Sequence, residues 1–136
     1  MQIMPDQTGR HEGLTERLSV VDVQSIFGYN CSVNVVVFET PVEQAAGLQY
    51  RPFIEPDTMF IFPGIKPGAV FHSRNVREPF DLAFLSFDNT VLYKARVHPE
   101  DEIAVAPQGT WTAVEARAGW LDHWKFVQGY RVELPL

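Results

Sequence analysis

The amino-acid sequence predicts a mainly β protein, a compact β-sandwich or barrel of jelly-roll type with one or two short helices. Three observations lead to this fold class. Short runs rich in β-branched and aromatic residues recur along the chain, and turn residues separate them. Ten prolines and ten phenylalanines in 136 residues favour short strands broken by rigid turns. The composition, 46% hydrophobic and 21% charged, is that of an ordinary globular domain.

The first strong strand signal begins at Ser32, where "SVNVVVFET" is rich in β-branched residues. The segment that follows, "TPVEQAAGL", has the pattern of a short helix. Thr40 can cap this helix, Pro41 suits its first position, and Glu43 can reach back to the cap amide. Gly47 is a natural stop, so we expect about two helical turns.

The second half of the chain predicts several more strands. "TMFIFPG" is apolar on both faces, which is typical of a buried strand. A hairpin is predicted over residues 80–97: the strand from Phe80 to Phe87 meets a two-residue turn at Asp88 and Asn89, and the return strand alternates apolar and polar residues. "GTWTAVEARAGW" predicts another strand, "WLDHWK" one helical turn, and "GYRVELPL" a final strand.

The length corresponds to one domain, and the first 28 residues differ from the rest. They are polar and contain glycine until a weak apolar pattern begins near Leu18. We therefore divide the chain into an N-terminal arm, residues 1–28, and a β-sandwich or barrel domain, residues 29–136. An ordered arm and a disordered tail are both open interpretations of the first segment.

Charge and cysteine content argue against several functional classes. The net charge is −6, and the three lysines and the arginines form no basic cluster, so we expect no nucleic-acid partner. No apolar run has the length of a membrane span, and the N-terminus lacks the pattern of a signal peptide. We expect a soluble protein that is not exported by a signal peptide, in the cytoplasm or a virion. The single cysteine, Cys31, allows neither an internal disulfide nor a cysteine-based zinc site.

A polar stretch, "FHSRNVREPFDL", leads into the most apolar strand and contains the best candidate site. Alternation places Asp81 on the same strand face as Ala83 and Leu85, where an ionised carboxylate needs a partner. Arg51 or Arg74 could pair with it through two hydrogen bonds. The candidate ligand-binding residues are Arg51, Arg74, Asn75, Asp81 and Glu115. Such a cluster could bind a small anionic or polar ligand, but the simpler interpretation is a network that anchors a loop.

Motifs for catalysis and for metal binding are weak. Ser73 and Ser86 lack a nucleophile-elbow motif, and no phosphate-binding loop is present. Among the histidines, His98 with Glu100 and Asp101 comes nearest to a metal site, and an exposed acidic turn explains that group more simply. We therefore predict no catalytic residue, no metal and no cofactor.

The motifs "TPVEQAAGLQYR", "MFIFP", "PFDLAFLSFDNTV" and "EARAGWL" occur in an order that resembles the family catalogued as domain of unknown function 192, over roughly residues 33–132. The resemblance implies a compact mainly β domain and no established activity. The family positions that it carries over are Arg51, Met59 to Pro63, Asn75, Asp81, Glu115 and Gly119. Members commonly have Trp-Met-Lys-Asn-Thr where this chain has His72-Ser73-Arg74-Asn75-Val76, so an activity built on that cluster would be altered here. Many members also look exported, and this chain does not.

These observations favour a non-enzymatic structural or assembly protein. It would dock on protein partners, a large assembly or copies of itself through its β-domain and its N-terminal arm, for example as an accessory or cement protein of a virus capsid. The alternative is a small-ligand-binding or enzymatic domain of unknown activity built on the five candidate residues, which should then line an open concave pocket. A plain monomer with a disordered tail is a third possibility.

Overall fold

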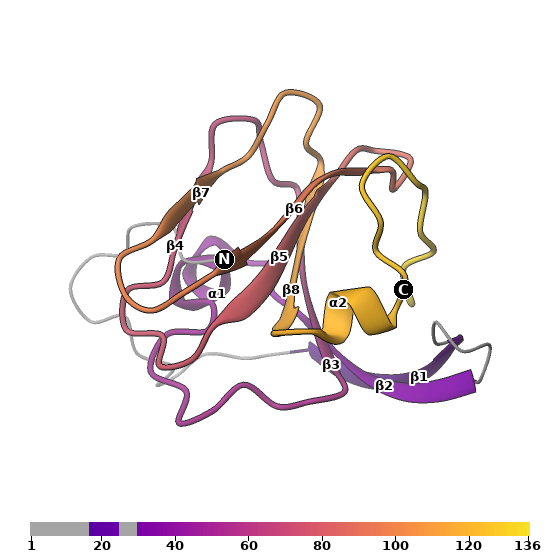
Figure 1. Cartoon of the computed structure of the whole chain (residues 1–136), viewed down its shortest axis with the longest axis horizontal. Helices are drawn as coiled ribbons and strands as arrows, with labels where there is room; N and C mark the ends of the chain where they lie inside the picture. The colour runs from indigo at the N-terminus through magenta and orange to yellow at the C-terminus, as the bar shows by residue number, and fades with distance from the viewer. Residues whose placement is uncertain (1–16, 25–29) are drawn as a thin grey trace.

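The computed structural model describes residues 17–24 and 30–136, with side chains from Val33 onward. Within these ranges the chain forms a six-stranded sheet in the order β1-β2-β3-β8-β5-β6 and a two-stranded sheet of β4 and β7 (Figure 1). The strands are β1 (Arg17–Gln24), β2 (Asn30–Val37), β3 (Thr58–Pro63), β4 (Val70–His72), β5 (Phe80–Leu85), β6 (Val91–Val97), β7 (Ile103–Val105) and β8 (Thr112–Arg117), and the helices are α1 (Pro41–Ala46) and α2 (Trp120–His123). The mainly β class is confirmed, and the two sheets form an open, sandwich-like arrangement.

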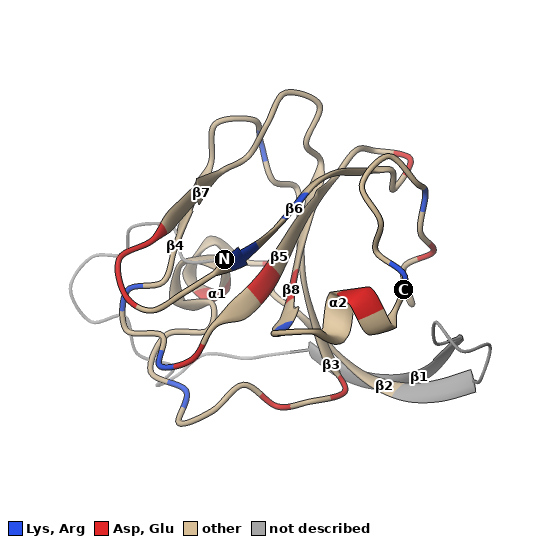
Figure 2. Ribbon diagram, in the orientation of Figure 1, with Lys and Arg blue, Asp and Glu red and all other residues tan. Residues whose placement is uncertain are grey.

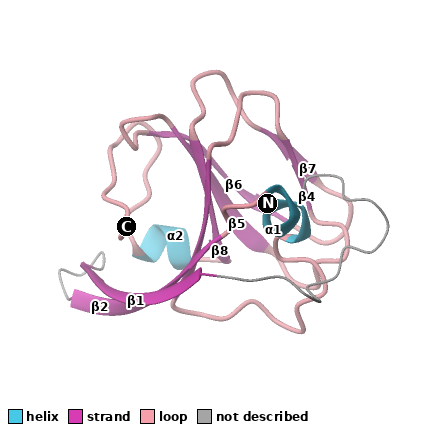
Figure 3. Ribbon diagram, turned by 180° about the vertical axis from the view of Figure 1, so that it is seen from behind, coloured by secondary structure: helices cyan, strands magenta, loops and turns pink. Residues whose placement is uncertain are grey.

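The large sheet has a covered layer on each face. Figures 1 and 3 place β4, β7 and α1 on one side of it, and α2 with the C-terminal segment on the other. The first side is packed with aromatic rings, among which Phe71 contacts Phe62 and Phe84 edge to face. The second side is packed with aliphatic residues of the sheet together with Leu121 and Trp124. Since both faces are buried, β3, β5 and β8 are largely apolar on both sides, without a regular alternation of apolar and polar residues.

Helix α1 begins and ends where the sequence predicts. The Glu43 backbone amide donates to Thr40 Oγ1 at 3.1 Å, and the Thr40 amide donates to Glu43 Oε1 at 2.9 Å, which completes the capping box. Gly47 follows the helix with a positive φ of 49°. The helix connects β2 to β3, which pair in parallel and therefore need a crossover connection.

The β5–β6 hairpin is confirmed, but its predicted two-residue turn is wrong. The Ser86 amide donates to the Thr90 carbonyl at 2.9 Å, and the Asn89 amide donates to the Ser86 carbonyl at 2.9 Å. These two bonds enclose a three-residue loop, and its last residue, Asn89, is left-handed with a φ of 65°. The predicted final strand is also wrong: the C-terminal segment makes one isolated bridge, between Thr90 and Arg131.

The N-terminal region contributes one described element to the sheet. Strand β1 lies within the predicted arm and pairs antiparallel with β2, from Arg17 opposite Val37 to Gln24 opposite Asn30. The remainder of the predicted arm lies outside the described residues, so the division into arm and domain stays a prediction. Neither described helix has the length and apolar character needed to cross a membrane.

Candidate functional site

The structure distributes the five predicted site residues over three places. Glu115 pairs with Leu82 in the β5–β8 register, whereas Asp81 is the residue before Leu82. Because successive residues of a strand point to opposite faces, Glu115 and Asp81 lie on opposite sides of the large sheet. Arg74 and Asn75 lie in the loop that follows β4. One site formed by all five residues is therefore wrong, and whether any of them binds a ligand stays a prediction.

Asp81 is a buried carboxylate with both oxygens hydrogen-bonded. Arg96 Nε donates to Asp81 Oδ1 at 2.8 Å, and the Gly119 amide donates to Oδ2 at 2.7 Å. The predicted partners, Arg51 and Arg74, are wrong: Arg96 lies directly opposite Asp81 in the β5–β6 register (Figure 2). The hydrogen bond and the charge of Asp81 raise the pKa of Arg96 above its ordinary value. This pair ties the hairpin to the start of α2.

Glu115 lies in the middle of β8, on the side covered by β4 and β7, and is fully buried. Burial raises the pKa of its carboxyl group, and the positive charge of Arg51 offsets part of that rise. The Arg51 guanidinium lies 4.9 Å from the centre of the Phe60 ring and 3.4 Å from a Glu55 carboxylate oxygen. The sequence thus places a titratable acid inside an aromatic core.

The loop after β4 forms a polar contact with the loop after α1. Asn75 Nδ2 donates to Gln49 Oε1 at 3.1 Å and to the Tyr50 hydroxyl at 2.9 Å, while the Tyr50 amide donates to the Asn75 carbonyl at 2.8 Å. Arg74 forms an exposed ion pair with Asp101 at 3.2 Å. These loops border a hollow of 350 Å³, which we call the loop hollow, lined by Tyr50, Asn75, Val76, Arg77, Pro99 and Glu100.

A second hollow, of 450 Å³, opens between β6 and β7, and we call it the edge groove. It is lined by Leu92, Tyr93, Ala95, Arg96, Val97, Glu102, Ile103, Ala104, Val105 and Pro107. Three large apolar residues along it are exposed: Ile103 by 65%, Val105 by 50% and Tyr93 by 43%. Sequence reasoning missed this groove because the short strand β7 was not predicted; the alternation of Ile103 and Val105 around Ala104 is the signal that could have indicated it.

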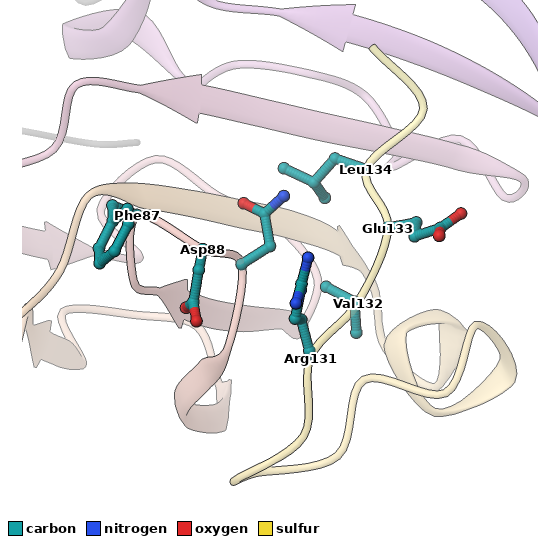
Figure 4. A pocket seen from close by; sticks show the side chains of 7 residues that line it. Phe87, Asp88, Arg131, Val132, Glu133 and Leu134 are labelled. Atoms are coloured by element: carbon teal, nitrogen blue, oxygen red, sulfur yellow. The ribbon is translucent and has the colours of Figure 1, made fainter.

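A third hollow, of 640 Å³, lies where the C-terminal segment meets the β5–β6 loop. Figure 4 shows Phe87 on one side of it and the segment from Val132 to Leu134 on the other. The carboxylate of Asp88 accepts hydrogen bonds from Ser86 and Thr90, which lower its pKa. The carboxylate of Asp88 is thus used to hold the β5–β6 loop. This third hollow is therefore a weaker candidate for ligand binding than the loop hollow and the edge groove.

Three of the four histidines, His72, His98 and His123, belong to the part of the chain that the structure describes, and His11 lies outside it. Within residues 17–24 and 30–136, no three His, Cys, Asp or Glu side chains are gathered in a way that could hold a metal ion. His98, the nearest candidate, contacts Glu102 through both its amide and its ring. The hydrogen bond that the backbone amide of His98 donates to Glu102 is the main reason that the pKa of Glu102 is lowered.

Comparison with known proteins adds the family and confirms the fold. Among solved structures, a candidate transcription regulator from Sinorhizobium meliloti 1021 is 20% identical with a TM-score of 0.72, covering 88% of this chain and 95% of its own. A protein of unknown function from Novosphingobium aromaticivorans DSM 12444 is 23% identical with a TM-score of 0.71, covering 96% and 99%. No curated protein sequence gives a significant match. Residues 23–134 match the family DUF192, described as "Uncharacterized ACR, COG1430", and the chain therefore belongs to this family.

Proposed function

We propose that the protein is a non-enzymatic docking module that binds an extended segment of a partner protein in the edge groove. One observation carries this proposal: two strand edges face the same groove. β6 is the last strand of the large sheet, and β7 pairs only with β4. No described backbone hydrogen bond joins β6 to β7. An edge strand presents unpaired N–H and C=O groups, which an added strand can use.

The side chains of the groove suit an extended apolar segment. In the β5–β6 register Tyr93 lies opposite Phe84 and Ala95 lies opposite Leu82, so both face the aromatic side of the sheet. The small Ala95 between Tyr93 and Val97 leaves room for an incoming side chain. Every second residue of a docked strand would point into the groove, so the preferred partner alternates apolar and polar residues.

The exposed residues of β7 give a further reason for a partner. Burying Ile103 and Val105 would remove two large apolar side chains from water, and each fully buried side chain of this kind contributes about 1.5 to 3 kcal/mol. A single inserted strand could pair with both edges and join the two sheets. The sequence led us to expect docking through the β-domain and the N-terminal arm, and the present proposal concerns one surface of the β-domain. Nothing in the fold singles out a virus capsid as its setting, so the proposal concerns the docking mode.

Selection from a displayed library of random ten-residue peptides on the full chain would test this proposal. We expect enriched peptides to alternate apolar and polar residues. Their binding should be lost in Ala95→Trp, which fills the groove, and in Val105→Asp, which places a charge on its wall. Val127→Asp is the matched control, because Val127 is 49% exposed, as Val105 is 50% exposed, and lies in the C-terminal segment on the other side of the sheet (Figure 1).

The control variant should bind the selected peptides as the wild type does. Circular dichroism of each variant would establish that it is folded. Failure to enrich any peptide would overturn the proposal, and so would peptides that bind folded Ala95→Trp and Val105→Asp as tightly as the wild type.

A further inference from the structure

We propose that the loop hollow binds a small zwitterion with the chemistry of a free α-amino acid. Its volume of 350 Å³ is at the lower end of the range for small-molecule sites. It shares no lining residue with the edge groove, and this inference does not rest on the proposed docking function. Three properties of its lining support the assignment: unused hydrogen-bonding groups, two opposite charges and a strained, fixed backbone.

The hydrogen-bonding groups of the hollow are arranged by Asn75. Its amide nitrogen donates to Gln49 and to the Tyr50 hydroxyl, so both amide hydrogens are used. Among the described residues, the carbonyl oxygen of the Asn75 side chain accepts no hydrogen bond. The Tyr50 hydroxyl accepts from Asn75, which leaves its own hydrogen to donate. The hollow therefore offers one fixed acceptor and one fixed donor to a ligand.

The charges of the hollow match the two ends of a zwitterion. Arg77 comes from the loop after β4 and Glu100 from the loop after β6, and both side chains line the hollow. Neither forms an ion pair with another described residue, whereas the neighbouring Arg74 and Asp101 are paired with each other. A guanidinium group binds a carboxylate, and a carboxylate binds an ammonium group. Val76 and Pro99 add apolar surface for a small aliphatic side chain.

The backbone around the hollow is held in an uncommon conformation. Tyr50 has a φ of 64° and Asn75 a φ of 60°, and this left-handed region is unfavourable for a bulky residue such as tyrosine. Asparagine adopts this region readily, so the unusual residue is Tyr50, and its amide donates to the carbonyl of Asn75, which links the two left-handed residues. Backbone strain of this kind clusters at binding sites, where it fixes polar groups before the ligand arrives.

The test is a titration of isotope-labelled full chain, followed by amide chemical shifts in NMR. The probes are L-alanine and L-valine, with propionate and ethylamine as analogues that carry a single charge. We expect saturable shifts at Tyr50, at residues 75–77 and at Glu100 with the amino acids, and at least tenfold weaker binding of both analogues. Absence of saturable shifts with both amino acids would overturn the inference, as would propionate or ethylamine binding equally well.

Variants of Arg77 and Glu100 then test which charged end of the amino acid each side chain binds. Arg77→Gln and Glu100→Gln should each weaken amino-acid binding at least fivefold, because each removes the partner of one charged end. Both positions are exposed, so the fold should be retained, which the amide spectrum of each variant would verify. Arg131→Gln and Glu133→Gln, at exposed positions of the C-terminal segment, are the matched controls and should bind as the wild type does. Equal affinity in all four variants would overturn the assignment.

Discussion

Asp81 and Glu115 are two buried carboxylates on neighbouring strands of one sheet, and their surroundings differ. Asp81 lies near the start of β5 and retains 3% of its exposure; Glu115 lies within β8 and retains none. Asp81 accepts hydrogen bonds from a half-exposed arginine and from a backbone amide at the start of α2. Glu115 faces the aromatic core, where burial raises its pKa.

The comparison indicates that two acids of nearly equal burial can have different roles, depending on where along the strand each one lies. Near the end of a strand, an arginine such as Arg96 can reach the carboxylate and still keep part of its guanidinium in water, so the charge of Asp81 is compensated. In the middle of a strand, the main influence on Glu115 is the loss of water, which favours its neutral form. We therefore interpret Asp81 as a structural ion and Glu115 as an acid whose protonation is coupled to folding.

The largest expected effect is that of Arg96→Met, which would leave the Asp81 charge in a side chain only 4% exposed. We expect this variant to lose about 2 to 3 kcal/mol of unfolding free energy, below the upper range for buried pairs because Arg96 itself is 45% exposed. Urea denaturation at pH 7 would measure it. A loss below about 0.5 kcal/mol would contradict the assignment of Asp81 as a charge that needs Arg96.

Asp81→Asn should cost less, about 1 to 2 kcal/mol, because the asparagine oxygen can still accept from the Gly119 amide and Arg96 can return to water. The double variant with Arg96→Met gives the sharper test. It should be more stable than Arg96→Met alone, since no buried charge then remains. If the loss of unfolding free energy in the double variant equalled the sum of the losses in the two single variants, Asp81 and Arg96 would not be coupled, contrary to our interpretation.

Glu115→Gln should change stability by less than about 1 kcal/mol at acid pH, where the carboxyl group is neutral in both states. As the pH rises above the ordinary value of 4.5, the unfolded chain releases this proton before the folded one does. Wild-type stability should therefore fall relative to that of Glu115→Gln between pH 4 and pH 7. Urea denaturation across this range would measure the difference. A wild type that gains on the variant with rising pH would indicate a lowered pKa and refute the contrast with Asp81.

The smallest effect is expected for Arg74→Gln. The ion pair of Arg74 with Asp101 joins two side chains that are 49% and 66% exposed. Exposed pairs of this kind contribute about 0.2 to 1 kcal/mol, so we expect a loss at the low end of that range. A thermal unfolding midpoint close to the wild-type value would agree with this. A loss as large as that of Arg96→Met would show that exposure is a poor guide to the value of ion pairs in this protein.

The sequence predicted helix α1, strand β3 and the β5–β6 hairpin from short runs of neighbouring residues. The capping box at Thr40 and Glu43 and the stop at Gly47 depend on neighbouring residues, and α1 follows them. The run at residues 58–63 is largely apolar on both faces because each face of β3 packs in a core on its own side of the large sheet. The hairpin was predicted, but its turn length was not. Asn89 is left-handed in both loop types, and a two-residue type I′ turn would also need a positive φ at Asp88, which Asp88 does not have.

The partners of the candidate site residues depend on how the strands pair with one another, and the sequence of a single strand does not contain this information. The choice of Arg96 as the partner of Asp81 follows from the β5–β6 register, and alternation within β6 alone could not reveal it. The separation of Asp81 from Glu115 likewise follows from a one-residue offset between β5 and β8. Strand β7 was missed because three residues give too short a pattern, and the edge groove depends on it.

Amide hydrogen exchange of the full chain, with and without a selected peptide, tests the central claim most directly. If an extended segment docks between the two strand edges, amides of residues 92–97 that are not bonded to β5 and amides of Ile103–Val105 that are not bonded to β4 should become protected together. Protection confined to other parts of the sheet, with exchange in β6 and β7 unchanged, would contradict the account.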